Sequence, residues 1–175
     1  INHGHIHFGE NKVQEATGKW TEIKKNFPKI KLHMIGKLQS NKVKYTVPLF
    51  DYIHSLDSLK LAEKIAVEQK KINKFLKIFI QVNIGDEDQK SGIQTKDLKS
   101  FFEKCLSTYK LNIIGLMCIP PNDNNTNTYF SEMQKLNNLL GLKELSMGMS
   151  ADYKQAIKFD STYVRIGSKI FGNRI

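Results

Sequence analysis

The residues of this chain whose types and spacing could do chemistry gather between Leu145 and Arg174. The sequence there predicts a strand, a loop, a short helix, a second strand and a glycine-flanked turn into another helix. Ser150 follows the first of these strands, and Gly167 and Ser168 follow the second. Small residues at strand ends let backbone N–H groups approach a ligand closely, and a helix N-terminus placed there attracts an anion. The segment therefore predicts a phosphate site, with Arg165 directed at the other end of the same ligand.

The same residues also admit purely structural explanations. Ser150 could be the N-cap of a helix over Ala151–Phe159, because serine oxygens accept hydrogen bonds at helix starts. Gly148 and Gly167 could serve tight turns only. Arg165, within an apolar strand, could pair with a structural carboxylate. The residues by themselves leave these alternatives open.

Seven strand-like segments, most of them followed by a helix-like one, should position these residues. Alternation of this kind predicts parallel strands joined by crossover helices. A closed (β/α)8 barrel has one strand more. The chain therefore predicts either an open doubly wound sheet or a barrel that lacks its first β/α unit. The strands are expected at His5–Phe8, Lys31–Ile35, Asp51–Leu56, Phe75–Asn83, Asn112–Ile119, Glu144–Gly148 and Thr162–Ile166.

The helices are predicted from apolar residues that recur with helical spacing and so share one face. Asp57 or Ser58 is expected to cap one helix, and Thr95 another. The inward faces are expected to carry Val13, Ala16, Trp20, Ile23 and Phe27; Leu59, Ala62, Ile65 and Ala66; Leu98, Phe101, Phe102, Cys105 and Leu106; and Phe130, Met133, Leu136, Leu139 and Leu140.

Length and composition indicate one globular domain over residues 1–175, incomplete at its N-terminus. No apolar run is long enough for a membrane helix, and the residues from Ile1 onward do not show a signal-peptide pattern. Cys105 and Cys118 lie in apolar segments and predict buried thiols of a reducing compartment. The net charge of +10 comes from lysines spread over helix faces without interleaved aromatic residues. This distribution argues against a nucleic-acid-binding surface.

Several motifs, in order, resemble the signatures of the pyridoxal phosphate homeostasis protein family, the YggS/PROSC group. Together they cover nearly the whole chain and are highly specific, although each alone is weak. They are His7–Asn11 with Val13–Glu15, His33–Gly36 with Leu38–Lys42, Gln81–Ile84 with Lys90–Gly92, Gly115–Met117, Leu145–Ser150 and Val164–Gly172.

This resemblance implies a TIM-type barrel similar to the alanine racemase N-terminal domain, which favours the barrel that lacks one unit. Members of the family hold pyridoxal 5'-phosphate (PLP) as a Schiff base to a lysine on the first strand, ahead of the Phe8–Asn11 signature. The sequence begins at Ile1, after that point, so we expect this lysine to be absent from the chain. We therefore assign no catalytic residue.

The resemblance also implies a set of cofactor-binding residues. Arg165 is expected to face the pyridine nitrogen, and Met117 to pack on the ring or only on its neighbours. Lys90, in a loop at the barrel mouth, is a candidate for passing the cofactor on, or a solvated loop lysine. Asn11 lies in the pocket or caps the first helix. The full set is Asn11, Ser55, Met117, Met149, Ser150, Arg165, Gly167 and Ser168.

The implied function is to bind PLP and to take part in its homeostasis and delivery, without catalytic turnover. The alternative is a PLP-dependent amino-acid racemase, which needs two bases on opposite faces of the substrate carbon. PLP-dependent apoenzymes are the expected partners, with no nucleic acid, membrane or metal. The protein is expected to be cytoplasmic and a monomer or homodimer. His33, in the middle of a strand, is expected to be a core or hydrogen-bonded histidine.

Overall fold

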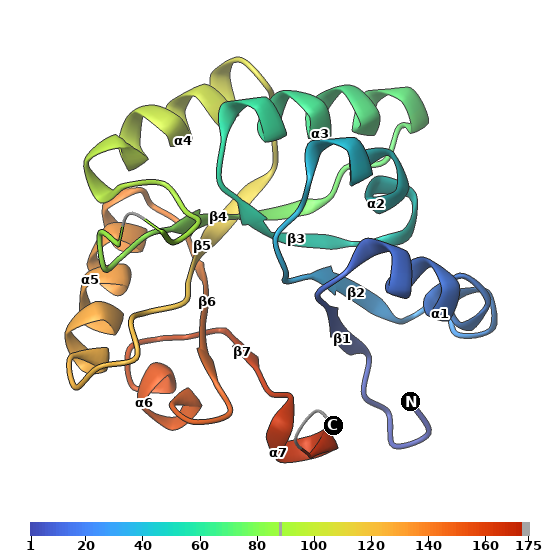
Figure 1. Cartoon of the computed structure of the whole chain (residues 1–175). Coiled ribbons are helices and arrows are strands. Elements are labelled where there is room, and N and C mark those ends of the chain that lie inside the picture. The colour runs from blue at the N-terminus through green and yellow to red at the C-terminus, as the bar shows by residue number, and fades with distance from the viewer. Residues whose placement is uncertain (88, 173–175) are drawn as a thin grey trace.

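Seven parallel strands form one sheet that curls into a nearly closed barrel (Figure 1). This computed structural model describes residues 1–87 and 89–172, so Arg174 lies outside the described residues. Every strand pairs with the next one along the chain. The strands are β1 (His7–Glu10), β2 (Lys31–Met34), β3 (Tyr52–Leu56), β4 (Lys77–Val82), β5 (Ile113–Cys118), β6 (Glu144–Met149) and β7 (Tyr163–Arg165).

The helices lie outside the ring of strands, as crossover connections between parallel strands require (Figure 1). Ser58 caps α3 because its Oγ accepts a hydrogen bond from the Leu61 amide at 3.3 Å. The helices are α1 (Val13–Asn26), α2 (Val43–Leu49), α3 (Leu59–Ile72), α4 (Leu98–Ser107), α5 (Thr126–Leu139), α6 (Tyr153–Ile157) and α7 (Ser168–Phe171), with short 3-10 helices η1 (Ser40–Lys42) and η2 (Thr95–Asp97).

The barrel is open along a seam between β1 and β7. Within the described residues these two strands have one partner each, whereas the five strands between them have two. All residues of β3 are buried, but β1 and β7 alternate between half-buried and exposed residues. Consecutive strand order with outer helices confirms the barrel lacking one unit and excludes the doubly wound sheet.

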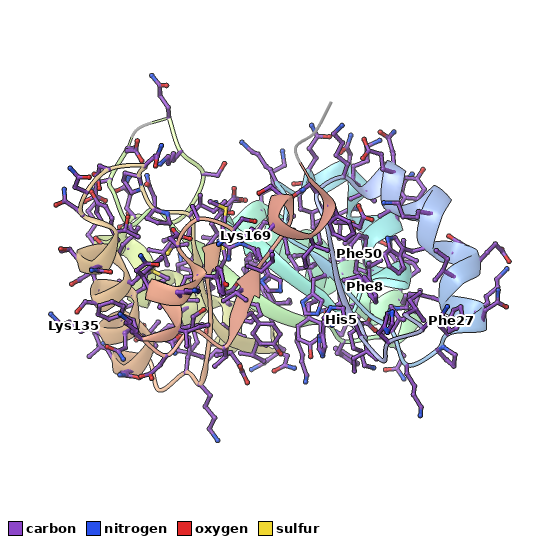
Figure 2. All side chains as sticks on the ribbon, turned by 90° about the horizontal axis from the view of Figure 1, so that it is seen from below. His5, Phe8, Phe27, Phe50, Lys135 and Lys169 are labelled. Carbon is purple, nitrogen blue, oxygen red and sulfur yellow. The ribbon has the colours of Figure 1, made fainter. Side chains whose placement is uncertain are left out.

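The main apolar core fills the space between the outer face of the sheet and the helices. It includes the fully buried Phe50 and Phe130, together with apolar residues from every strand between β2 and β6. In the side-on view of Figure 2, Phe27 at the end of α1 and Lys135 on α5 lie on opposite flanks of the molecule. None of the helices in the described parts of the chain is long and apolar enough to span a membrane.

Some residues near the C-terminal ends of helices were wrongly predicted to face inward. Leu106 and Leu139 were expected inside, but they are 40% and 77% exposed, and Phe27 is 42% exposed. Leu106 and Leu139 lie in the last turns of α4 and α5, and Phe27 directly follows α1. Thr95 makes no capping bond and begins η2 instead.

Candidate functional site

Arg165 is the last residue of β7, and its side chain enters the barrel. Its Nη1 donates to the backbone oxygen and to the Oγ of Ser146, both at 2.8 Å. Its Nη2 donates to the Cys118 carbonyl oxygen, also at 2.8 Å. The guanidinium therefore crosses β6 and reaches the end of β5. These bonds use three N–H donors, and a guanidinium has others to offer.

Arg165 is half-buried, and its guanidinium has no carboxylate at ion-pair distance among the described residues. None of the ion pairs in the described part of the chain includes this residue, so a structural carboxylate partner is not what holds it. Burial lowers the pKa of the guanidinium, but an arginine remains a cation in proteins. Burial also raises the pKa of the neighbouring Cys118 thiol to about 12, so this thiol stays neutral. A half-buried cation with spare donors is suited to bind an acceptor atom of a ligand.

The loops after β6 and β7 meet at Ser150 and Gly167. The Gly167 amide donates to the Ser150 Oγ at 3.2 Å. Ser150 is not the N-cap of α6, because that position belongs to Asp152, whose Oδ1 accepts from the Met149 amide at 2.6 Å. The structure thus brings together two of the residues predicted to hold a phosphate, and Ser168 follows directly at the start of α7.

The two glycines of these loops differ in what they require. Gly148 has a φ of +91°, and a Cβ placed on it would lie 2.6 Å from the Ala156 Cβ. It therefore serves a tight turn and lets α6 approach β6. Gly167 has an ordinary φ of −121°, and an added Cβ would meet nothing within 4 Å. Packing within the described residues therefore does not explain a glycine at position 167.

Ser55, Met117 and Asn11 lie on three different strands or strand ends. The Ser55 Oγ is buried and has no hydrogen-bond partner among the residues that the structure describes. Met117 is fully buried and packs in the barrel interior with Tyr52 and Phe79. Asn11 is exposed after β1 and is not the cap of α1, since Lys12 occupies that position.

Lys90 lies in the loop after β4, as the sequence predicts. Its ammonium group pairs with Glu87 and approaches the Pro120 carbonyl oxygen at 3.4 Å. The side chain is therefore tethered between this loop and the one that follows β5.

The barrel interior also holds a row of polar rings that the sequence prediction missed in part. His33 is 4% exposed and hydrogen-bonded on both sides, which confirms the expectation of a hydrogen-bonded core histidine. His54 and Ser146 continue the row toward Arg165. The sequence signal that could have predicted these rings is the two-residue spacing of Tyr52 and His54 within one strand, because residues two apart in a strand lie on the same face.

Comparisons with known proteins agree with this fold. Residues 1–174 match the family "Alanine racemase, N-terminal domain". The chain is 39% identical to the pyridoxal phosphate homeostasis protein of Aquifex aeolicus, over 95% of this chain and 76% of that protein. It is 36% identical to the protein of the same name from Escherichia coli, over 99% and 78% of the two chains.

Solved structures show the same likeness. PipY of Synechococcus elongatus with PLP bound has a TM-score of 0.89 and 35% identity, over 97% of this chain and 82% of that one. The alanine racemase of Bartonella henselae has a TM-score of 0.72 at 17% identity, over 98% and 48%, and shows the fold alone.

Proposed function

The chain belongs to the pyridoxal phosphate homeostasis protein family, and we propose that it binds PLP at the mouth of its barrel for cofactor homeostasis and delivery. The observation that carries this proposal is the guanidinium of the half-buried Arg165, which is held by hydrogen bonds inside the barrel and has no carboxylate partner among the described residues. The PLP-bound structure of PipY, similar over 97% of this chain, supports the choice of ligand.

The residues present fit the cofactor at both of its ends. Arg165 would face the ring nitrogen, where a permanent cation donates a hydrogen bond but does not give up its proton. Gly167 and Ser150, with Ser168, would hold the phosphate, since small residues and backbone N–H groups suit an anion. The buried Ser55 Oγ, which lacks a partner among the described residues, would gain one from the ligand. Asn11, Met117 and Met149 complete the proposed pocket.

The bound cofactor supplies a reactive aldehyde and an electron-withdrawing ring. Arg165 keeps the ring nitrogen unprotonated in this proposal, which weakens the electron withdrawal that racemase and transaminase chemistry needs. The chain is therefore proposed to store and deliver the cofactor rather than to turn over substrate. A racemase assay with L-alanine and PLP tests this directly, and turnover would contradict the storage role.

Delivery requires partners, which we propose are PLP-dependent apoenzymes. Lys90 remains a candidate for passing on the aldehyde, but its tie to Glu87 would have to break first. The two cysteines are buried and unpaired within the described residues, which is consistent with the proposed cytoplasmic location.

The phosphate end offers a clean test in Gly167→Ala. The φ of Gly167 is negative, as it is for most L-residues, and an added Cβ would enter space that is open in the structure. The variant should fold normally, yet bind PLP at least tenfold more weakly in an absorbance titration, because the methyl group blocks close approach of the phosphate. Gly18→Ala on α1, where an added Cβ also meets nothing within 4 Å, is the matched control. Equal PLP affinity of Gly167→Ala and wild type would remove position 167 from the phosphate site.

A further inference from the structure

Four side chains form a continuous row of hydrogen bonds that ends on Arg165. His7 Nδ1 lies 2.9 Å from His33 Nε2, and His33 Nδ1 lies 2.9 Å from His54 Nε2. His54 Nδ1 lies 2.8 Å from the Ser146 Oγ, which accepts from Arg165 Nη1 at 2.8 Å. The row crosses the interior from β1 through β2, β3 and β6 to β7. His33, His54 and Ser146 are all buried.

The three rings are neutral, so each has one N–H donor and one acceptor nitrogen. Burial lowers the pKa of His33 to about 3 and that of His54 well below its ordinary value, and it is also the main cause of the lowered pKa of His7. Because each ring contacts the next through nitrogen, one must donate where the other accepts. The three tautomers are therefore linked. The hydrogen bonds of the whole row are donated either from Ser146 toward His7 or from His7 toward Ser146.

Arg165 selects one direction. It can only donate, so the Ser146 Oγ accepts from it and must place its own hydrogen elsewhere. His54 Nδ1 is the acceptor that lies within reach. In the opposite direction Ser146 would receive two donors, and its buried hydroxyl hydrogen would have no acceptor among the described residues. Such a buried unsatisfied donor is costly.

Electrostatics favours the same direction. When Ser146 donates to His54, each ring turns its lone pair toward the guanidinium and its N–H away from it. The ring dipoles then present their negative ends to the guanidinium of Arg165. Successive donors and acceptors also strengthen one another along such a row. A cation can in this way be held in the barrel without a neighbouring carboxylate.

We propose that Ser146, His54 and His33 are positioning residues that fix Arg165 for the cofactor through a row of hydrogen bonds with one direction, from Arg165 to His7. The role of these three residues in cofactor binding rests on the proposed function. The direction of the hydrogen bonds in the row does not depend on that function. In this arrangement all three histidines carry their proton on Nε2. The remaining N–H donors of Arg165 are left for the ligand.

The direction is tested by long-range 1H–15N NMR of the whole chain, labelled with 15N-histidine, at neutral pH. Wild type should show His7, His33 and His54 as the Nε2–H tautomer, with signals assigned by single histidine substitutions. The exposed His3 provides the reference for a histidine outside the row. Finding His33 or His54 protonated on Nδ1 would overturn the proposed direction.

The positioning role is tested by Ser146→Ala, which removes the link between Arg165 and His54. PLP affinity should fall about tenfold, as expected for losing a hydrogen bond to a charged group, and the tautomers of His54 and His33 should become mixed. Ser146→Thr keeps the hydroxyl and should therefore show wild-type PLP affinity and wild-type tautomers of His54 and His33. Ser161→Ala is the matched control, because the Ser161 Oγ donates to the Met147 carbonyl oxygen of the same strand at 2.7 Å, outside the row.

His54→Phe provides a second variant should Ser146→Ala fail to fold. The new ring can keep the stacking that His54 makes on Phe79, at a centroid distance of 4.3 Å. Wild-type PLP affinity in folded Ser146→Ala or His54→Phe would overturn the positioning role. Absence of PLP binding by wild type would overturn the proposed function and the positioning role together, while the NMR tautomers would still decide the direction of the row.

Discussion

The guanidinium of Arg165 is held inside the barrel by two carbonyl oxygens and one hydroxyl, and it has no ion-pair partner in the part of the chain that the structure describes. We expect Arg165→Leu to weaken PLP binding more than tenfold in an absorbance titration, because the proposed donor to the ring nitrogen is lost. The free energy of unfolding should fall by about 1–3 kcal/mol, since two buried carbonyl groups lose their donor. Lys135→Leu removes the same charge from an exposed site on α5 and is the control. Unchanged affinity of the Arg165 variant would contradict its ring contact.

His33 makes the stability depend on pH. Burial lowers its pKa from 6.5 to about 3, so between these values the unfolded chain binds more protons than the folded one. Stability should therefore fall as pH drops below 6.5, by about 1 kcal/mol per pH unit for this residue. Urea unfolding from pH 4.5 to 7.5 measures the slope. His33→Phe, which can keep the stacking on Tyr52, should flatten it, whereas His3→Gln at an exposed site should not. Parallel curves for all three proteins would refute this account.

The elements around the site are held by the close approach of α6 to the end of β6. Gly148 has positive φ, and an added Cβ would lie 2.6 Å from the Ala156 Cβ and 3.0 Å from the Tyr153 Cα. Gly148→Ala should therefore cost roughly 2–5 kcal/mol of stability, combining the backbone penalty with overpacking. Gly141→Ala, at φ +67° with nothing within 4 Å, should show only the backbone cost of roughly 1–2 kcal/mol. Equal losses in urea unfolding would mean that the helix contact is unimportant.

The whole molecule presents two sheet edges along the seam between β1 and β7 (Figure 1). Unpaired edges are templates for pairing with another chain. The 175-residue chain should therefore self-associate, with an average mass that rises with concentration in sedimentation velocity. Val164→Lys places a charge on β7 and should reduce the association. Val67→Lys on α3, a site of similar exposure, should leave it unchanged. A single monomeric species at every concentration would contradict the prediction.

The sequence alone determined the order of strands and helices, the barrel that lacks one unit, and the family. These features depend on local spacing and on ordered motifs, which a chain carries whatever its tertiary contacts. The same spacing predicted Leu106 and Leu139 wrongly, because periodicity does not show which side chains of a helix's last turn the rest of the protein covers. The cofactor-binding roles of the predicted residues remain predictions.

Only the tertiary structure decided which side chains meet inside the barrel. His54 and Ser146 are 92 residues apart in sequence and come within 2.8 Å. Gly167 contacts Ser150 rather than an adjacent loop residue, and Arg165 bonds to carbonyl oxygens of β5 and β6. Such partners depend on strand register and on the curvature that turns the inner faces toward one another. Strand register and curvature cannot be predicted from the residue spacing of any single segment, because register arises only when the strands pair.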